Sequence, residues 1–315
     1  MSSILVTGGG GFIGAAVVEA LAARGDTVAA FDIAASPKLL RLCETNRNFT
    51  YVPGELTEWP QLTAAFQRHK PDAVIHCAAI VGVINSIASP MATMRVNIEG
   101  SLNVLAAMRL FGVPRLLNLS SEEIYGPFGA DRIDETHPCH PVKPYGISKF
   151  AVEQLARDHA AEYGTSIIHL RTCWVYGPGL PRPRIPKTLV DAAVEGRALH
   201  LPSGADFRVD QVYIDDLVQG MLKALDHAEH PYDAYHISTG EAPSLGEIGA
   251  MVRDLVPGAD IVIGPGLYDF AAGVRPVRKG ALDCTRAREA FGYAPRFDMR
   301  RGLEAYIAAR RQGIG

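Results

Sequence analysis

Short apolar runs alternate with longer amphipathic stretches up to Ser238, and this alternation predicts the fold class. Helical stretches separate the first six runs. Two of these helical stretches are long and cover Ala92–Phe111 and Tyr145–Tyr163. Strands that alternate with helices predict an α/β fold built on a doubly wound parallel sheet. The runs that predict strands are Ser3–Val6, Thr27–Phe31, Thr50–Pro53, Ala73–His76, Arg115–Leu119, Ser166–Arg171 and Ala234–Ser238.

The pattern changes after Trp174, where several prolines break regular structure and only short amphipathic segments follow. This change predicts two domains. The larger, sheet-containing domain comprises residues 1–173 and 209–240, and a smaller C-terminal domain comprises 174–208 and 241–315. The short segments predict helices over Thr188–Glu195, Ser244–Leu255, Thr285–Ala290 and Arg301–Arg310.

A glycine-rich loop, TGGGGFIG, follows the first predicted strand and opens a predicted helix. In this context Gly8 permits a tight turn, Gly11 lets the backbone approach a pyrophosphate, and Gly14 lets helix pack on strand. Asp32 ends the second strand, 18 residues after Gly14. A carboxylate there suits the hydroxyls of an adenosine ribose and repels a 2′-phosphate. The larger domain is therefore predicted to bind a dinucleotide, with NAD preferred over NADP.

Tyr145 and Lys149 lie four residues apart in PYGISK, so a helix places them on one face. A lysine ammonium beside a phenol stabilises the phenolate and lowers the tyrosine pKa. Such a tyrosine is suited to take a proton from an alcohol. Any amphipathic helix can carry this spacing by chance, so the prediction depends on the motifs elsewhere in the chain.

Six segments in order resemble the motifs of one family. They are TGGGGFIG, VIHCAA, VNIEGSLNVL, SSEEIYG, YGISK and VYGPG. The chain resembles an extended short-chain dehydrogenase/reductase of the NAD-dependent epimerase/dehydratase family. The resemblance implies a catalytic serine or threonine, a tyrosine and a lysine, which fall on Ser121, Tyr145 and Lys149.

The resemblance also implies NAD as the cofactor and a set of residues that bind it. The cofactor set is Gly8, Gly11, Phe12, Ile13, Asp32, Ile33, Glu55, Leu56, Ala78, Ala79, Ile80, Asn97, Leu119, Ser120, Tyr145, Lys149 and Thr172. The predicted substrate set is Val81, Glu122, Trp174, Arg184, Lys187, Arg208 and Arg275, of which Arg184, Lys187 and Arg275 are included as cations that could serve an anionic group.

The motifs imply transient oxidation of a substrate hydroxyl to a ketone, most simply in an epimerase or dehydratase of nucleotide-linked sugars. Glu123 stands where dehydratases and decarboxylases of the family place an acid, so it is a candidate base; otherwise it caps a loop or pairs with an arginine. Three positions depart from the family, and the first, Glu55 in place of an aspartate, matters little. Trp174 replaces an asparagine, and Arg208 stands one residue early, which turns a strand side chain to the other face.

These departures favour an alternative, an NAD-dependent dehydrogenase of a free sugar, sugar acid or polyol that releases NADH. A third possibility, a module that binds NAD without catalysis, is disfavoured by the intact set of Ser121, Tyr145 and Lys149.

Composition and charge agree with a cytoplasmic enzyme. The 315 residues carry a net charge of −3 with scattered basic residues, which argues against a nucleic-acid partner. The five cysteines are dispersed, so no metal site is expected, and no apolar run is long enough for a membrane span. Relatives pair the two long helices of each subunit into a four-helix bundle. A homodimer is therefore expected, with an apolar face formed by Met94, Ile98, Leu102, Leu105 and Met108.

Overall fold

The computed structural model describes residues 2–269, 274 and 276–314 and divides into two compact units. The first unit comprises Met1–Gly126, Pro138–Arg171 and Val218–Tyr235. The second comprises Pro127–His137, Thr172–Leu217 and His236–Gly315. Each unit is described by itself below.

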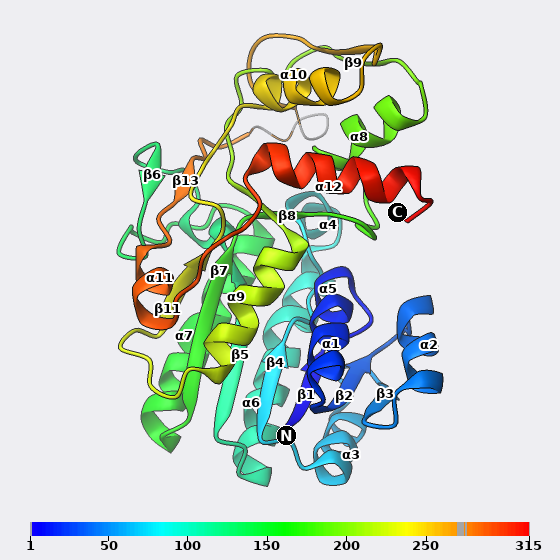
Figure 1. Cartoon of the computed structure of the whole chain (residues 1–315). Coiled ribbons are helices and arrows are strands. Elements are labelled where there is room, and N and C mark those ends of the chain that lie inside the picture. The colour runs from blue at the N-terminus through cyan, green and yellow to red at the C-terminus, as the bar shows by residue number, and fades with distance from the viewer. Residues whose placement is uncertain (1, 270–273, 275, 315) are drawn as a thin grey trace. The chain divides into compact units, whose positions relative to one another are not determined.

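A seven-stranded sheet confirms the predicted doubly wound parallel architecture (Figure 1). Its order is β11-β7-β5-β4-β1-β2-β3, and β1 pairs in parallel with both β2 and β4. The chain order therefore reverses beside β1, and ligands of such sheets bind at this reversal, outside the carboxyl ends of the strands. The strands are β1 (Ser3–Thr7), β2 (Thr27–Asp32), β3 (Phe49–Pro53), β4 (Ala73–His76), β5 (Arg115–Ser121), β7 (Ser166–Thr172) and β11 (Ala234–Ile237).

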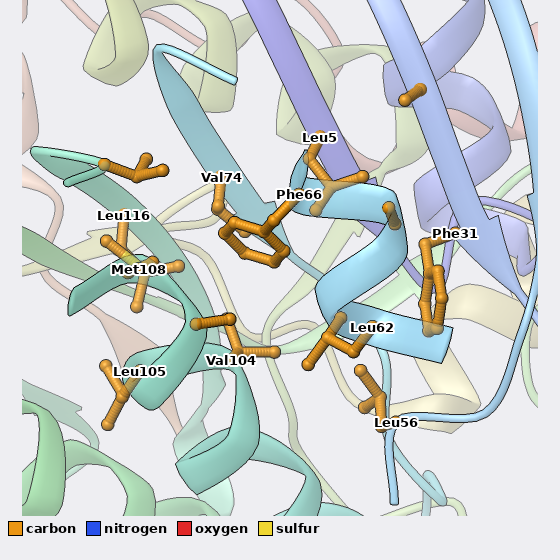
Figure 2. Close-up of a cluster of buried hydrophobic side chains, with 14 of the residues drawn as sticks. Leu5, Phe31, Leu56, Leu62, Phe66, Val74, Val104, Leu105, Met108 and Leu116 are labelled. Atoms are coloured by element: carbon orange, nitrogen blue, oxygen red, sulfur yellow. The ribbon is translucent and has the colours of Figure 1, made fainter. Parts of the chain in front are cut away.

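Helices cover the sheet and bury an apolar core against it. Figure 2 shows Phe66 of one helix and Val104 and Met108 of another beside Leu5 and Val74 of the strands. All five side chains are fully buried. The helical elements are α1 (Phe12–Arg24), α2 (Pro37–Thr45), α3 (Trp59–His69), α4 (Val83–Ala88), α5 (Pro90–Met94), η1 (Arg95–Glu99), α6 (Gly100–Phe111), η2 (Glu122–Tyr125), α7 (Pro144–Tyr163) and α9 (Ile214–Asp226), the last of which crosses the unit boundary.

The predicted single helix over Ala92–Phe111 is wrong in one respect. The structure divides it into three elements: α5, the π-helical turn η1, and α6. The π-turn carries Asn97, whose buried side chain bonds to the backbone of Ile80. A π-bulge is common at functional sites, and here a tertiary contact overrides the local helical pattern.

The second unit contains short elements, and the four predicted amphipathic segments are all helical. They correspond to α8 (Lys187–Val194), α10 (Leu245–Leu255), α11 (Thr285–Phe291) and α12 (Met299–Arg311). Three two-stranded parallel sheets join β8 (Trp174–Tyr176) to β10 (Gln211–Tyr213), β9 (Leu199–Leu201) to β12 (Ile261–Ile263), and β6 (Arg132–Ile133) to β13 (Ala281–Leu282).

Within residues 2–269, 274 and 276–314, no helix combines the length and apolar character needed to cross a membrane. The same residues contain no cluster of three or more His, Cys, Asp or Glu side chains able to hold a metal ion.

Candidate active site

Backbone segments approach one another closely at the glycine loop after β1. Gly8 has a φ of +71°, and a Cβ there would lie 2.5 Å from the backbone nitrogen of Ala78. A Cβ on Gly14 would lie 2.0 Å from the carbonyl oxygen of Gly8. Only glycine fits at these two positions, so β1, the segment after β4 and α1 meet closely. The N-terminus of α1, at Phe12 and Ile13, has no side-chain cap, and backbone N–H groups at such a helix start fit a pyrophosphate.

Asp32 ends β2 next to this loop, where an adenosine ribose is expected. Its carboxylate accepts hydrogen bonds from the amides of Gly10 at 2.8 Å and Ala34 at 3.3 Å. A carboxylate has about four acceptor positions, so capacity remains for ribose hydroxyls. The neighbouring Ile33 is 76% exposed, and Glu55, the other acid of the cofactor set, is also exposed. These residues fit the adenosine half of NAD.

Tyr145 and Lys149 lie on the buried face of α7. Tyr145 is 8% exposed and Lys149 is 5% exposed. The Lys149 ammonium donates a hydrogen bond of 2.8 Å to the carbonyl oxygen of Leu119, near the end of β5. Burial lowers the pKa of Lys149 to about 8, against the opposing influence of Cys77 and Glu153.

Ser121 ends β5 and caps η2, the short helix that carries both glutamates. Its Oγ accepts a hydrogen bond of 3.2 Å from the amide of Glu123, a bond that does not use the hydroxyl proton. A Cβ on Gly146 would lie 2.4 Å from the carbonyl oxygen of Glu123, so glycine lets α7 press against η2. The structure thus places Ser121 and the Glu123 backbone at the start of α7.

The two acids of η2 differ in exposure. Glu123 is half-buried, whereas Glu122, predicted to contact substrate, is only 1% exposed and points into the protein interior. Of the two, Glu123 is the acid that solvent or a ligand can reach. The Asn97 side chain bonds to the backbone of Ile80 and to the hydroxyl of Ser148, as suits the structural asparagine of the family motif.

A buried ion pair behind the site was missed by the sequence reasoning. Glu153 of α7 and Arg171 of β7 form two hydrogen bonds, at 2.7 and 3.0 Å. Ser120 donates to Glu153 at 2.6 Å, and Arg171 donates to the Tyr125 hydroxyl at 2.7 Å. The pair ties α7 to the ends of β5 and β7 and to η2. The available signals were an acid one turn after Lys149 and an arginine that ends an apolar strand.

The surroundings of Glu153 keep its carboxyl group ionised. Burial alone would raise the pKa of Glu153, but His169, Arg171 and Ser120 outweigh burial and lower it to about 2. Arg171 is charged at every accessible pH, with a pKa held above its ordinary value because Glu153 more than offsets burial. A buried pair of this kind is stable only while both partners are present.

The second unit holds most of the predicted substrate residues. Trp174 is 3% exposed, and the Arg184 guanidinium stacks on its ring, 3.7 Å from the centroid. Lys187 forms an ion pair with Asp191 at 2.5 Å. Arg208 forms a two-bond pair with Glu247, at 2.9 and 3.1 Å.

Three further residues belong to the predicted sets. Thr172 donates to the carbonyl oxygen of Ile237 at 3.0 Å, and Val81, which follows β4, is 36% exposed. Arg275 lies outside the described residues. The remaining cofactor positions, Leu56, Ala79, Leu119 and Ser120, are buried or half-buried in the first unit.

Comparisons with known proteins agree with the motifs. The model of the NAD dependent epimerase/dehydratase family matches residues 4–238. UDP-glucose 4-epimerase of Mycolicibacterium smegmatis is 29% identical over 306 residues, which is 95% of each chain. dTDP-glucose 4,6-dehydratase of Xanthomonas campestris is 34% identical over 239 residues, 71% of this chain and 68% of that protein.

A solved structure extends the likeness over both units. UDP-glucose 4-epimerase of Thermotoga maritima, determined with UDP-glucose, superimposes with a TM-score of 0.89 at 29% identity and covers 99% of each chain. The family resemblance inferred from the six motifs and the expectation of an NAD-dependent enzyme are confirmed.

The Glu153–Arg171 pair gives a prediction about acid stability. Glu153→Leu leaves Arg171 buried without its partner, so we expect the free energy of unfolding to fall by about 3–5 kcal/mol. In Glu153→Leu/Arg171→Met neither charge remains, and we expect most of the loss to be recovered. Urea denaturation at a series of pH values measures both.

The pH dependence supplies the control. The Glu153 pKa is lowered from 4.5 to about 2, so its stabilisation is complete above pH 4.5 and is lost as the pH falls through 2. The wild type should therefore lose more stability over this interval than the double variant. Equal losses in the two proteins would show that the pair does not stabilise the fold.

Proposed function

Because this chain belongs to the NAD-dependent epimerase/dehydratase family, we propose that it converts a nucleotide-linked sugar through transient oxidation of one hydroxyl to a ketone. The observation that carries the proposal is the burial of Tyr145 and Lys149 on one face of α7, packed against η2 with Ser121 at its cap. Relatives named as epimerases and as a dehydratase support the same class of reaction.

Each residue of the site has a distinct task in this reaction. Bound NAD supplies the hydride acceptor. Tyr145 takes the proton of the substrate hydroxyl as a general base, an effect typically worth about 10²- to 10⁴-fold in rate. Lys149, while protonated, stabilises the Tyr145 phenolate. The Ser121 hydroxyl donates a hydrogen bond to the substrate oxygen and stabilises the charge that develops there.

We propose that residues 174–208 and 241–315 recognise the substrate and that the remainder binds the cofactor. The Thermotoga relative was solved with UDP-glucose, which makes a nucleoside diphosphate sugar the first candidate substrate. We assign the anion-binding role to Arg184, whose guanidinium the buried Trp174 ring holds by stacking. Arg208, by contrast, is paired with Glu247. This pairing favours a second candidate function, the oxidation of a free sugar or sugar acid with release of NADH.

We further propose a cytoplasmic homodimer formed through α6 and α7. Exposed apolar side chains lie on both helices, including Leu110 at 63% exposure and Tyr163 at 49%. The predicted apolar face is only partly available, because Leu105 and Met108 are buried in the core of the first unit. The scattered cysteines are consistent with a reducing compartment.

A substrate screen tests the proposed function. Purified protein is incubated with NAD and UDP- or dTDP-linked sugars, or with free aldonates and uronates, while product and NADH are followed. We expect conversion of a sugar nucleotide without net NADH. Tyr145→Phe should keep NAD affinity and lose at least about 100-fold in turnover, because only the ionisable hydroxyl is removed.

Two results of this screen would contradict the proposal. Steady accumulation of NADH with a free sugar acid assigns the enzyme to the dehydrogenases. Turnover of Tyr145→Phe near the wild-type rate removes Tyr145 from the role of base.

Glu123 separates elimination from epimerisation. If the carboxylate removes a C–H proton beside the ketone, Glu123→Gln should complete the first hydride transfer and stop there. A single-turnover absorbance trace would then show NADH that stays on the protein. If Glu123 only shapes the loop, the variant should complete turnover with a modest change in rate. Glu122→Gln is the matched control, because it makes the same chemical change in the neighbouring side chain, which is buried.

The dimer prediction is tested by charge placed on the proposed interface. Leu110→Glu should shift the protein toward monomer in sedimentation velocity, because burying a carboxylate at an apolar contact is unfavourable. Leu40→Glu, which alters a 52%-exposed leucine on α2, should not change the state. A wild type that sediments as a monomer at micromolar concentration contradicts the assignment.

A further inference from the structure

A line of buried polar side chains runs from the strand before the glycine loop to the helix that carries Tyr145. Its members come from five elements, β1, β4, α6, η1 and α7, several of which are visible around the sheet in Figure 1. Polar groups inside an apolar core are unfavourable unless they are hydrogen-bonded. The members are Thr7, His76, Ser101, Asn97 and Ser148, each at most 4% exposed.

The first half of the line joins the sheet to the π-turn. Thr7 and His76 are register partners on the paired strands β1 and β4, and the Thr7 hydroxyl lies 2.6 Å from His76 Nδ1. His76 Nε2 lies 2.9 Å from the Ser101 hydroxyl. Ser101 in turn donates to the carbonyl oxygen of Asn97, inside the π-turn.

The direction of each bond follows from the chemistry of the last acceptor. A carbonyl oxygen only accepts, so the single hydroxyl proton of Ser101 goes to Asn97. Ser101 therefore accepts from His76, which must carry its hydrogen on Nε2. Nδ1 of His76 is then the acceptor, and Thr7 is the donor. Burial, assisted by Lys149, lowers the pKa of His76 to about 3, so the ring is neutral at physiological pH.

The second half of the line joins the π-turn to the catalytic helix. The Asn97 side chain accepts from the amide of Ile80 at 2.7 Å and donates to its carbonyl at 3.2 Å. It also donates to the Ser148 hydroxyl at 2.9 Å. Ser148 donates to the carbonyl oxygen of Tyr145 at 2.8 Å. Asn97 thus fixes the segment after β4 and the first turn of α7 at the same time.

We propose that His76 is a positioning residue: held as the Nε2–H tautomer between Thr7 and Ser101, it fixes the π-turn and so orients Tyr145 relative to the glycine loop. The inference rests on the proposed role of Tyr145 as base. His76 itself contacts neither substrate nor cofactor in this scheme. Its effect on the reaction arises because proton and hydride transfer require closely held geometry, and small misplacements are costly.

Two substitutions at Thr7 form a matched test. Thr7→Val keeps the shape of the side chain and removes the donor to His76 Nδ1, whereas Thr7→Ser keeps the donor. We expect the single-turnover oxidation rate to fall about tenfold in Thr7→Val, with NAD affinity changed by less than about threefold, since the loss of one buried hydrogen bond is of this order. Thr7→Ser should restore the rate to near the wild-type value.

Two readouts do not require turnover and so separate this inference from the proposed function. Nitrogen chemical shifts of His76 in the wild type should identify Nε2 as protonated and Nδ1 as bare. Amide hydrogen exchange in the first turn of α7 should be faster in Thr7→Val than in Thr7→Ser.

If His76 of the wild type is the Nδ1–H tautomer, the proposed hydrogen-bond directions are wrong. This test uses the wild type alone, so it holds even if Thr7→Val fails to fold. Equal exchange in the two variants, or equal rates in folded variants, shows that the line does not position Tyr145. Inactivity of the wild type on every substrate, with the expected tautomer and exchange, would contradict the proposed function alone.

Discussion

The burial of one lysine ammonium against the end of a strand is the interaction on which the site depends. Lys149 is 5% exposed, and its ammonium donates to the Leu119 carbonyl at 2.8 Å. Removing a charge from water is unfavourable, so the fold must supply partners and a rigid position. Two features supply these: Gly146 lets α7 approach η2, and Glu153 anchors the next turn of the helix to Arg171.

The same arrangement links stability to function. Because burial lowers the Lys149 pKa to about 8, the charged form destabilises the folded state at neutral pH. That penalty is complete below pH 8 and disappears as the pH rises from 8 to 10.5, the ordinary value. A protein that only needed to fold would place an apolar residue there. In the proposed mechanism the lysine is retained because its ammonium stabilises the Tyr145 phenolate.

The sequence predicted the features that depend on local pattern. The strands of the sheet, the glycine loop, and α7 with Tyr145 and Lys149 follow from apolar periodicity and short motifs, and the structure has them. The π-turn at Asn97 was not predictable, because it depends on Ile80, which is distant in sequence. The pairing of Arg208 with Glu247 was missed for the same reason: 39 residues separate the partners. Long-range polar contacts leave little trace in a single sequence.

Short motifs, close backbone contacts and buried polar networks together build the site. Short motifs determine which residues reach the carboxyl edge of the sheet, and glycines at Gly8, Gly14 and Gly146 let the elements approach closely. Buried polar networks, through Glu153 on one side and His76 on the other, then hold α7 in place. Two residues of the second unit depart from the family motifs: Trp174, on which Arg184 stacks, and Arg208, which pairs with Glu247.

A direct titration of Lys149 tests this account most simply. Nuclear magnetic resonance of the lysine side-chain nitrogen in the NAD-free protein, assigned by comparison with Lys149→Met, reports the protonation of that ammonium as a function of pH. The account predicts a midpoint near pH 8, well below the ordinary 10.5, because the group is buried against Leu119. A midpoint at the ordinary value would mean that Lys149 is solvated, and the packing of α7 described above would be wrong.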